Sequence, residues 1–169
     1  MAAWLMALAL HLKPVDFLPL NLSMLQYIVF RLLASFCGVF GFSIMFNSPV
    51  PLAMSAAVIC AISNTLRLEL VDLASLPPAA AAFFAAMIAG LLDSAYKKHS
   101  GFPRIAITVP SIVIMVPGLY LYRAIYNLGM MNLSISASWF ASATLIILAL
   151  PLGLIFARIM TDKMFRYCT

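Results

Sequence analysis

Residues 104–123 read RIAITVPSIVIMVPGLYLYR, an apolar stretch with an arginine at each end. Its uncharged interior, residues 105–122, is long enough to cross a membrane, because a spanning helix needs about 20 apolar residues. Yet Pro110 lies inside it, and Pro117 is followed directly by Gly118. A proline removes a backbone hydrogen bond and clashes with the preceding turn. We therefore predict a membrane helix that is broken near Pro117.

Such a break leaves backbone polar groups without helical partners inside the bilayer. These groups are tolerated where they are buried in protein or line a watery cavity, and many transporters build substrate and ion sites from broken helices. A kink that only shapes the bundle is the alternative interpretation. Ser111, Tyr120, Tyr122 and Arg123 cluster around the break and offer donors to an anionic group, which favours a site.

The whole chain has the composition of a membrane protein. Of its 169 residues, 65% are hydrophobic and 9% are charged, with a mean hydropathy of +1.09, whereas soluble domains carry roughly 25% charged residues. We expect an all-α integral membrane protein, a bundle of five transmembrane helices whose fourth helix is broken by proline and glycine. The expected spans are residues 24–46, 51–68, 76–92, 105–126 and 133–157.

One transmembrane domain, residues 22–160, is expected to hold these spans. Residues 1–21 are expected to form an interfacial segment, because their apolar start lacks the basic residues and the small-residue cleavage site of a signal peptide. Residues 161–169 form a basic tail. No part of this organisation leaves room for a soluble domain.

The basic residues indicate orientation. Lys and Arg number 10 against 5 Asp and Glu, and they lie beside the apolar stretches, so we expect them to meet lipid rather than nucleic acid. One side of the membrane carries Lys13, Arg31, Arg67 and Arg123, and the other carries Lys97, Lys98, Arg104, Arg158, Lys163 and Arg166. The richer side is expected to be cytoplasmic, which places the N-terminus outside and the C-terminus inside.

Small residues predict where helices approach each other, since close packing in lipid depends on them. Ala82, Ala86 and Gly90 lie four apart in the third expected span, and Ala34 and Gly38 form a similar pair in the first. Ordinary helix packing is the main interpretation. A sliding surface used in alternating access is the other.

Polar residues near the end of the second span allow two interpretations. Asn64 and Arg67 lie three apart on one helix face and could point into a polar path. Alternatively, Arg67 and Glu69 simply mark the membrane interface. Glu69 and Asp93 are the acidic residues closest to a span, and both are expected at the interface.

The sequence contains no HExxH, GxSxG or P-loop motif, and its three cysteines have no metal-binding spacing. We therefore expect no catalytic residues, no metal site and no cofactor, and we do not expect an enzyme. Without a nucleotide-binding segment, transport by this chain would have to use a gradient.

The segments Gly41-Phe42-x-x-x-Phe46-Asn47-x-Pro49 and PSIVIMVPG at residues 110–118, with the placing of Arg67 and Gly90, carry a resemblance. Over about residues 24–157 the chain resembles the threonine/serine exporter family, more narrowly the small membrane subunit of its split, two-gene form. The second of these segments, in which Pro110 is followed seven residues later by Pro117-Gly118, is the most specific element of the resemblance. The family usually has another proline where Ile114 stands.

The resemblance implies gradient-driven export of small polar carboxylate metabolites, threonine or serine in fused members and a dicarboxylate such as succinate in some split ones. It also implies the bacterial cytoplasmic (inner) membrane and a larger companion membrane subunit. Alternatives are a non-transporting membrane scaffold subunit and a homo-oligomeric channel. On the exporter hypothesis, the substrate path is lined by Asn64, Arg67, Ser111, Pro117, Gly118, Tyr120 and Arg123.

Overall fold

The computed structural model describes residues 23–100 and 104–162, where all regular structure is helical. The expected interfacial segment, residues 1–21, and most of the basic tail, residues 163–169, lie outside this part of the chain. The helices are α2 (Met24–Met45), α3 (Val50–Asp72), α4 (Pro78–Ser100), α5 (Arg104–Val113), α6 (Gly118–Gly129) and α7 (Leu133–Thr161).

Four of these helices, α2, α3, α4 and α7, are long and apolar enough to cross a membrane by themselves. Helices α5 and α6 meet the same test together, as one span bent by 45°. The predicted all-α membrane fold with a broken fourth span is confirmed, and the chain is a multi-pass membrane protein.

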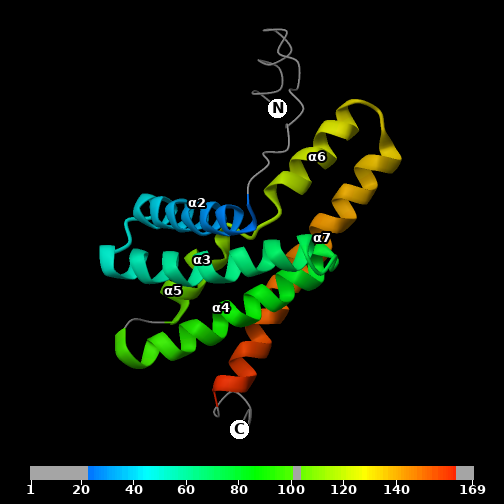
Figure 1. Ribbon diagram of the computed structural model, residues 1–169. Helices are drawn as coiled ribbons and strands as arrows, with labels where there is room; N and C mark the ends of the chain where they lie inside the picture. The colour runs from blue at the N-terminus through cyan, green and yellow to red at the C-terminus, as the bar shows by residue number, and fades with distance from the viewer. Residues whose placement is uncertain (1–22, 101–103, 163–169) are drawn as a thin grey trace.

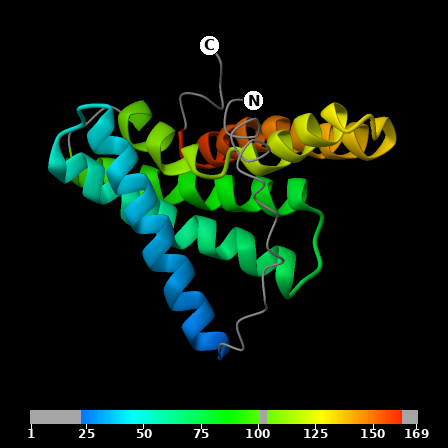
Figure 2. The ribbon, with the colours of Figure 1, turned by 90° about the horizontal axis from the view of Figure 1, so that it is seen from above.

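Helix α3 lies at the centre of one group of helices, in contact with α2, α4 and α5. Helix α7 connects this group to α6, because it packs against both α4 and α6. Both views show α6 and the N-terminal part of α7 side by side as a hairpin that extends away from α2 (Figures 1 and 2). The broken span therefore has one half, α5, within the α2–α4 group and the other half in the hairpin.

Helices α4 and α7 approach closely through small residues. A Cβ atom added to Gly90 would lie 2.7 Å from Cβ of Ala157, and one added to Gly153 would lie 2.4 Å from the carbonyl oxygen of Phe83. Ala86 is fully buried in the same contact region. Glycine is required where two helix backbones come this close.

The turn between α2 and α3 brings the two helices side by side. Asn47 adopts a left-handed conformation, with φ of 57°, which asparagine tolerates better than most residues. The amide of Ser48 donates to the carbonyl of Ser43 at 3.1 Å, and Pro49 precedes the first turn of α3. This arrangement places the C-terminal part of α3 beside the N-terminal part of α2.

Candidate functional site

The break in the fourth span consists of residues 114–117. The amides of Met115 and Val116 donate to carbonyls three residues back, at 2.9 and 3.2 Å, so the end of α5 is wound more tightly than an α-helix. Pro117 then has φ −78° and ψ 54°, and the amide of Gly118 donates to the carbonyl of Val116 at 2.8 Å. This is an inverse γ-turn, and it redirects the chain into α6.

The first turn of α6 has open backbone donors. The amide of Leu121 reaches the carbonyl of Pro117 at 3.1 Å, but the amides of Leu119 and Tyr120 meet no acceptor among the residues that the structure describes. Helix N-termini carry partial positive charge and bind anions through such amides. Gly118 leaves space here, since an added Cβ would have no neighbour within 4 Å.

Arg67 reaches the break from α3. Its Nη1 donates to the carbonyl of Met115 at 3.1 Å, and its Nε is buried and meets no acceptor among the described residues. Met115 is itself fully buried, in a core cluster against which Tyr120 packs. The structure thus brings together Arg67, Pro117, Gly118 and Tyr120, four of the predicted site residues.

Asn64 lies one turn before Arg67 and connects α3 to α2. Its Nδ2 donates to Oγ of Ser35 at 2.8 Å, while its Oδ1 is buried and has no donor in the described part of the chain. Oγ1 of Thr65, the next residue, is also buried and unmatched. Helix α3 therefore carries buried polar side chains at residues 64 and 65, followed by the arginine at residue 67.

Ser111 is fully buried in α5, and its hydroxyl donates to the carbonyl of Thr108 at 2.8 Å. Thr108 in turn donates to the carboxylate of Asp93 on α4. Asp93, expected at the membrane interface, is fully buried against the neighbouring helices. Helix α4 continues to Ser100, so Asp93 lies inside the helix and faces its neighbours.

The Asp93–Thr108 pair was missed at the sequence level. A carboxylate close to the apolar part of a span was the available signal, since ionisable residues in membrane helices usually mark a site or a partner. The threonine partner could not be found in this way, because it lies on a different helix.

Arg123 lies on α6, away from the break. It is exposed, and its guanidinium carbon lies 4.8 Å from the ring centroid of Trp139 on α7. Tyr120 packs edge-on against the same ring, with 5.5 Å between centroids. Tyr122 is also exposed and stacks on Tyr126. An aromatic cluster thus holds Arg123 in the hairpin, one and a half turns beyond Gly118.

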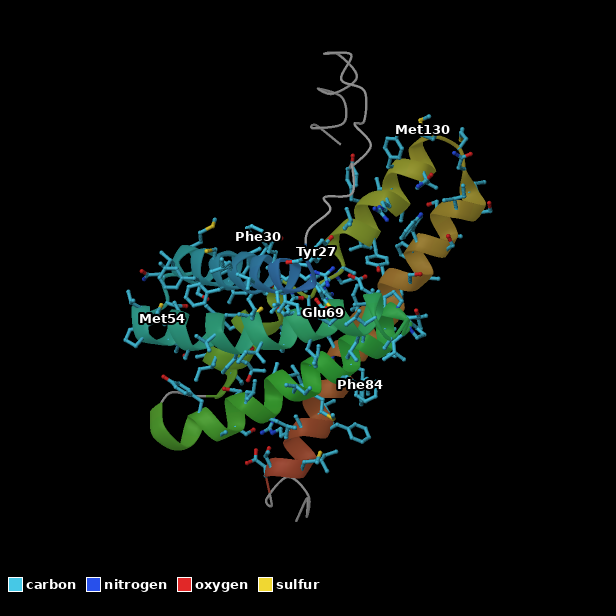
Figure 3. The ribbon with its side chains drawn as sticks, viewed as in Figure 1. Tyr27, Phe30, Met54, Glu69, Phe84 and Met130 are labelled. Carbon is cyan, nitrogen blue, oxygen red and sulfur yellow. The ribbon has the colours of Figure 1, made fainter. Side chains whose placement is uncertain are left out.

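Glu69 and Asp72 at the end of α3 are engaged by Arg31 of α2. Nη1 of Arg31 lies 2.8 Å from Oε1 of Glu69, and Nη2 binds the carboxylate of Asp72. The guanidinium carbon also lies 4.5 Å from the ring centroid of Tyr27, and Figure 3 shows Tyr27 near Glu69 where α2 meets α3. These carboxylates neutralise Arg31 and make no described bond to Arg67.

The predicted packing residues occupy different environments. Ala82 and Ala86 are fully buried, and Gly90 lies against α7. Gly38 faces the break, since a Cβ added there would lie 2.8 Å from Cδ1 of Ile114. Ala34 is exposed.

The family model described as "Threonine/Serine exporter, ThrE" matches residues 31–160. An uncharacterized protein of Haemophilus influenzae is 29% identical over 165 residues, an alignment that covers 88% of this chain and 54% of that protein. The chain thus spans about half the length of this curated relative. No solved structure matches the chain.

Proposed function

Because the chain belongs to the threonine/serine exporter family, we propose that it is a subunit of a gradient-driven secondary exporter of small polar carboxylate metabolites. Threonine, serine and a dicarboxylate such as succinate all carry the group that the site would bind. The observation that carries this proposal is the bond from Arg67 to the carbonyl of Met115, which puts a positive charge at the broken span.

The proposed substrate path runs past this break. Arg67 attracts the carboxylate, and the open amides at the start of α6 supply directional hydrogen bonds. Asn64, Ser111 and Tyr120 shape the path around it. Arg123, exposed on α6, draws anions toward it. Many transporters build their substrate sites from broken helices, because the freed backbone groups can bind a solute.

The partner proposed for this chain is a larger companion membrane subunit. The family match covers most of the chain, yet the chain spans about half of its Haemophilus influenzae relative. A second polypeptide could supply the rest of the path. We place the complex in the bacterial cytoplasmic membrane, with the N-terminus of this chain outside and the C-terminus inside, as the distribution of basic residues favours.

Efflux of threonine, serine and succinate from cells that produce the chain with its companion tests the site. Arg67→Ala should lower efflux at least about tenfold, because it removes a charged hydrogen bond to the carboxylate. Arg123→Ala should lower it less. Gly118→Leu should also lower it, because its side chain would occupy space at the start of α6, where an added Cβ has no neighbour within 4 Å.

Arg158→Ala is the matched control, because Arg158 is exposed near the end of α7 and lies 3.7 Å from Asp162 in an ion pair. Its efflux should equal that of the wild type. Normal efflux at normal protein levels in all three site variants would remove this site assignment.

A further inference from the structure

Arg67 connects the broken span to α3 with only part of its guanidinium. Nη1 donates to the carbonyl of Met115 at 3.1 Å. Because Nη1 is the nitrogen on the Cδ side, Nε and Nη2 together form a separate edge of the planar group. Nε is buried without an acceptor, and Nη2 meets none within the described residues. One full edge of this cation is therefore unengaged.

The carboxylates of α3 and α4 are bound to other groups. Glu69 and Asp72 bind Arg31, and Asp93 accepts a hydrogen bond from Thr108. Buried donors without acceptors are costly in a membrane protein. The two parallel N–H bonds of an Nε/Nη2 edge match the two oxygens of a carboxylate, which arginine binds in this bidentate way.

We propose that Arg67 is a two-sided receptor, which binds the carboxylate of one solute on its Nε/Nη2 edge while Nη1 holds the carbonyl of Met115. This inference rests on the proposed function and adds a coupling to it. A bound carboxylate fixes the guanidinium and strengthens its bond to Met115, since linked hydrogen bonds polarise one another. Carboxylate binding therefore stabilises the break, and the broken conformation favours carboxylate binding to the same extent.

Hydrogen–deuterium exchange of peptides that cover residues 112–121 measures this coupling. The full chain in lipid nanodiscs is compared in sodium chloride, sodium succinate and L-threonine at equal ionic strength. At least one of the two carboxylates should slow exchange in these peptides, because the bound guanidinium holds the turn in place.

Arg67→Lys is the informative variant, because lysine keeps the charge but has no planar edge for bidentate binding. It should need at least about tenfold more carboxylate to slow exchange. Arg67→Gln, which lacks the charge as well as the edge, gives the same test if the lysine variant is not recovered. Arg31→Lys is the matched control, because Arg31 lies on α2 and binds Glu69 and Asp72 rather than the break. Carboxylate should slow exchange in this variant as much as in the wild type.

Unchanged exchange in the wild type, or the same carboxylate dependence in both Arg67 variants, would overturn the two-sided role. Efflux by the same variants separates this inference from the exporter proposal. If Arg67→Lys abolishes efflux without altering the exchange response, the coupling is wrong and the exporter role stands. If the wild type shows Arg67-dependent slowing but exports none of the solutes, the receptor stands and the exporter proposal fails.

Discussion

The polar side chains of Arg31, Asn64 and Arg67 each have a different kind of hydrogen-bond partner within the membrane fold. Arg31 binds two carboxylates, and Asn64 donates to a serine hydroxyl on α2. Arg67 binds a backbone carbonyl, which carries no net charge. Charged groups in membrane helices need a partner that compensates them, and we propose that an anionic solute compensates the charge of Arg67.

Gly153 is the residue at which the α4–α7 contact is most sensitive to substitution. Gly153→Ala would bring a Cβ atom to 2.4 Å from the carbonyl oxygen of Phe83, and a backbone atom cannot move aside as a side chain can. We expect this variant to lose about 1–3 kcal/mol of stability, measured as a lower melting temperature of the detergent-solubilised protein.

Gly41→Ala is the control for this substitution. An added Cβ at Gly41 has no neighbour within 4 Å, and alanine is the better helix former. Its melting temperature should be equal to or slightly above that of the wild type. Equal melting temperatures for both variants would show that α4 and α7 are not packed as described.

Helix α5 is only 10 residues long, and two polar connections join it and the turn after it to neighbouring helices, in addition to the apolar packing of Ile107. Arg67 binds the turn that follows it, and Asp93 of α4 accepts a hydrogen bond from Thr108 within it. Both bonds come from helices of the α2–α4 group. The break can therefore be held in place although the broken span lacks continuous helical hydrogen bonding.

Thr108→Val removes one of these connections with little change of shape. The buried carboxylate of Asp93 loses a donor, so we expect a loss of about 1–3 kcal/mol in stability and lower efflux. Thr144→Val is the matched control, since Thr144 is exposed and its hydroxyl donates to the carbonyl of Phe140 in its own helix at 2.9 Å. Melting curves that coincide for the two variants would contradict this role of Thr108.

The break was predictable because proline and glycine act on their own backbone. Pro117 and Gly118 determine a local turn whatever surrounds them. The bond between Arg67 and Met115 was not predictable in the same way, because it joins α3 to a residue of the break 48 positions further along the chain. Gly153 and Ala157 do have the spacing that indicated packing in the third span, so this contact could have been found from the sequence.

The complete molecule is proposed to include more than this chain. The α6–α7 hairpin extends away from α2 (Figure 2), and it presents Arg123 and Tyr122 at its exposed surface. A companion subunit that packed against this hairpin could complete a path between Arg67 and Arg123. The composition of the chain predicted its membrane class, but a path shared by two polypeptides cannot be deduced from one of them.

Reconstitution in liposomes tests the role of Arg67 in a path shared with the companion. Gradient-driven movement of labelled threonine, serine or succinate is measured with the companion alone, with the companion and this chain, and with the companion and the Arg67→Ala chain. We predict rapid transport only with the wild-type chain present. If the companion alone transports as fast as the companion with this chain, this chain is a scaffold. Passive flux by this chain alone would make it a channel. Full transport with the Arg67→Ala chain would contradict the proposed site.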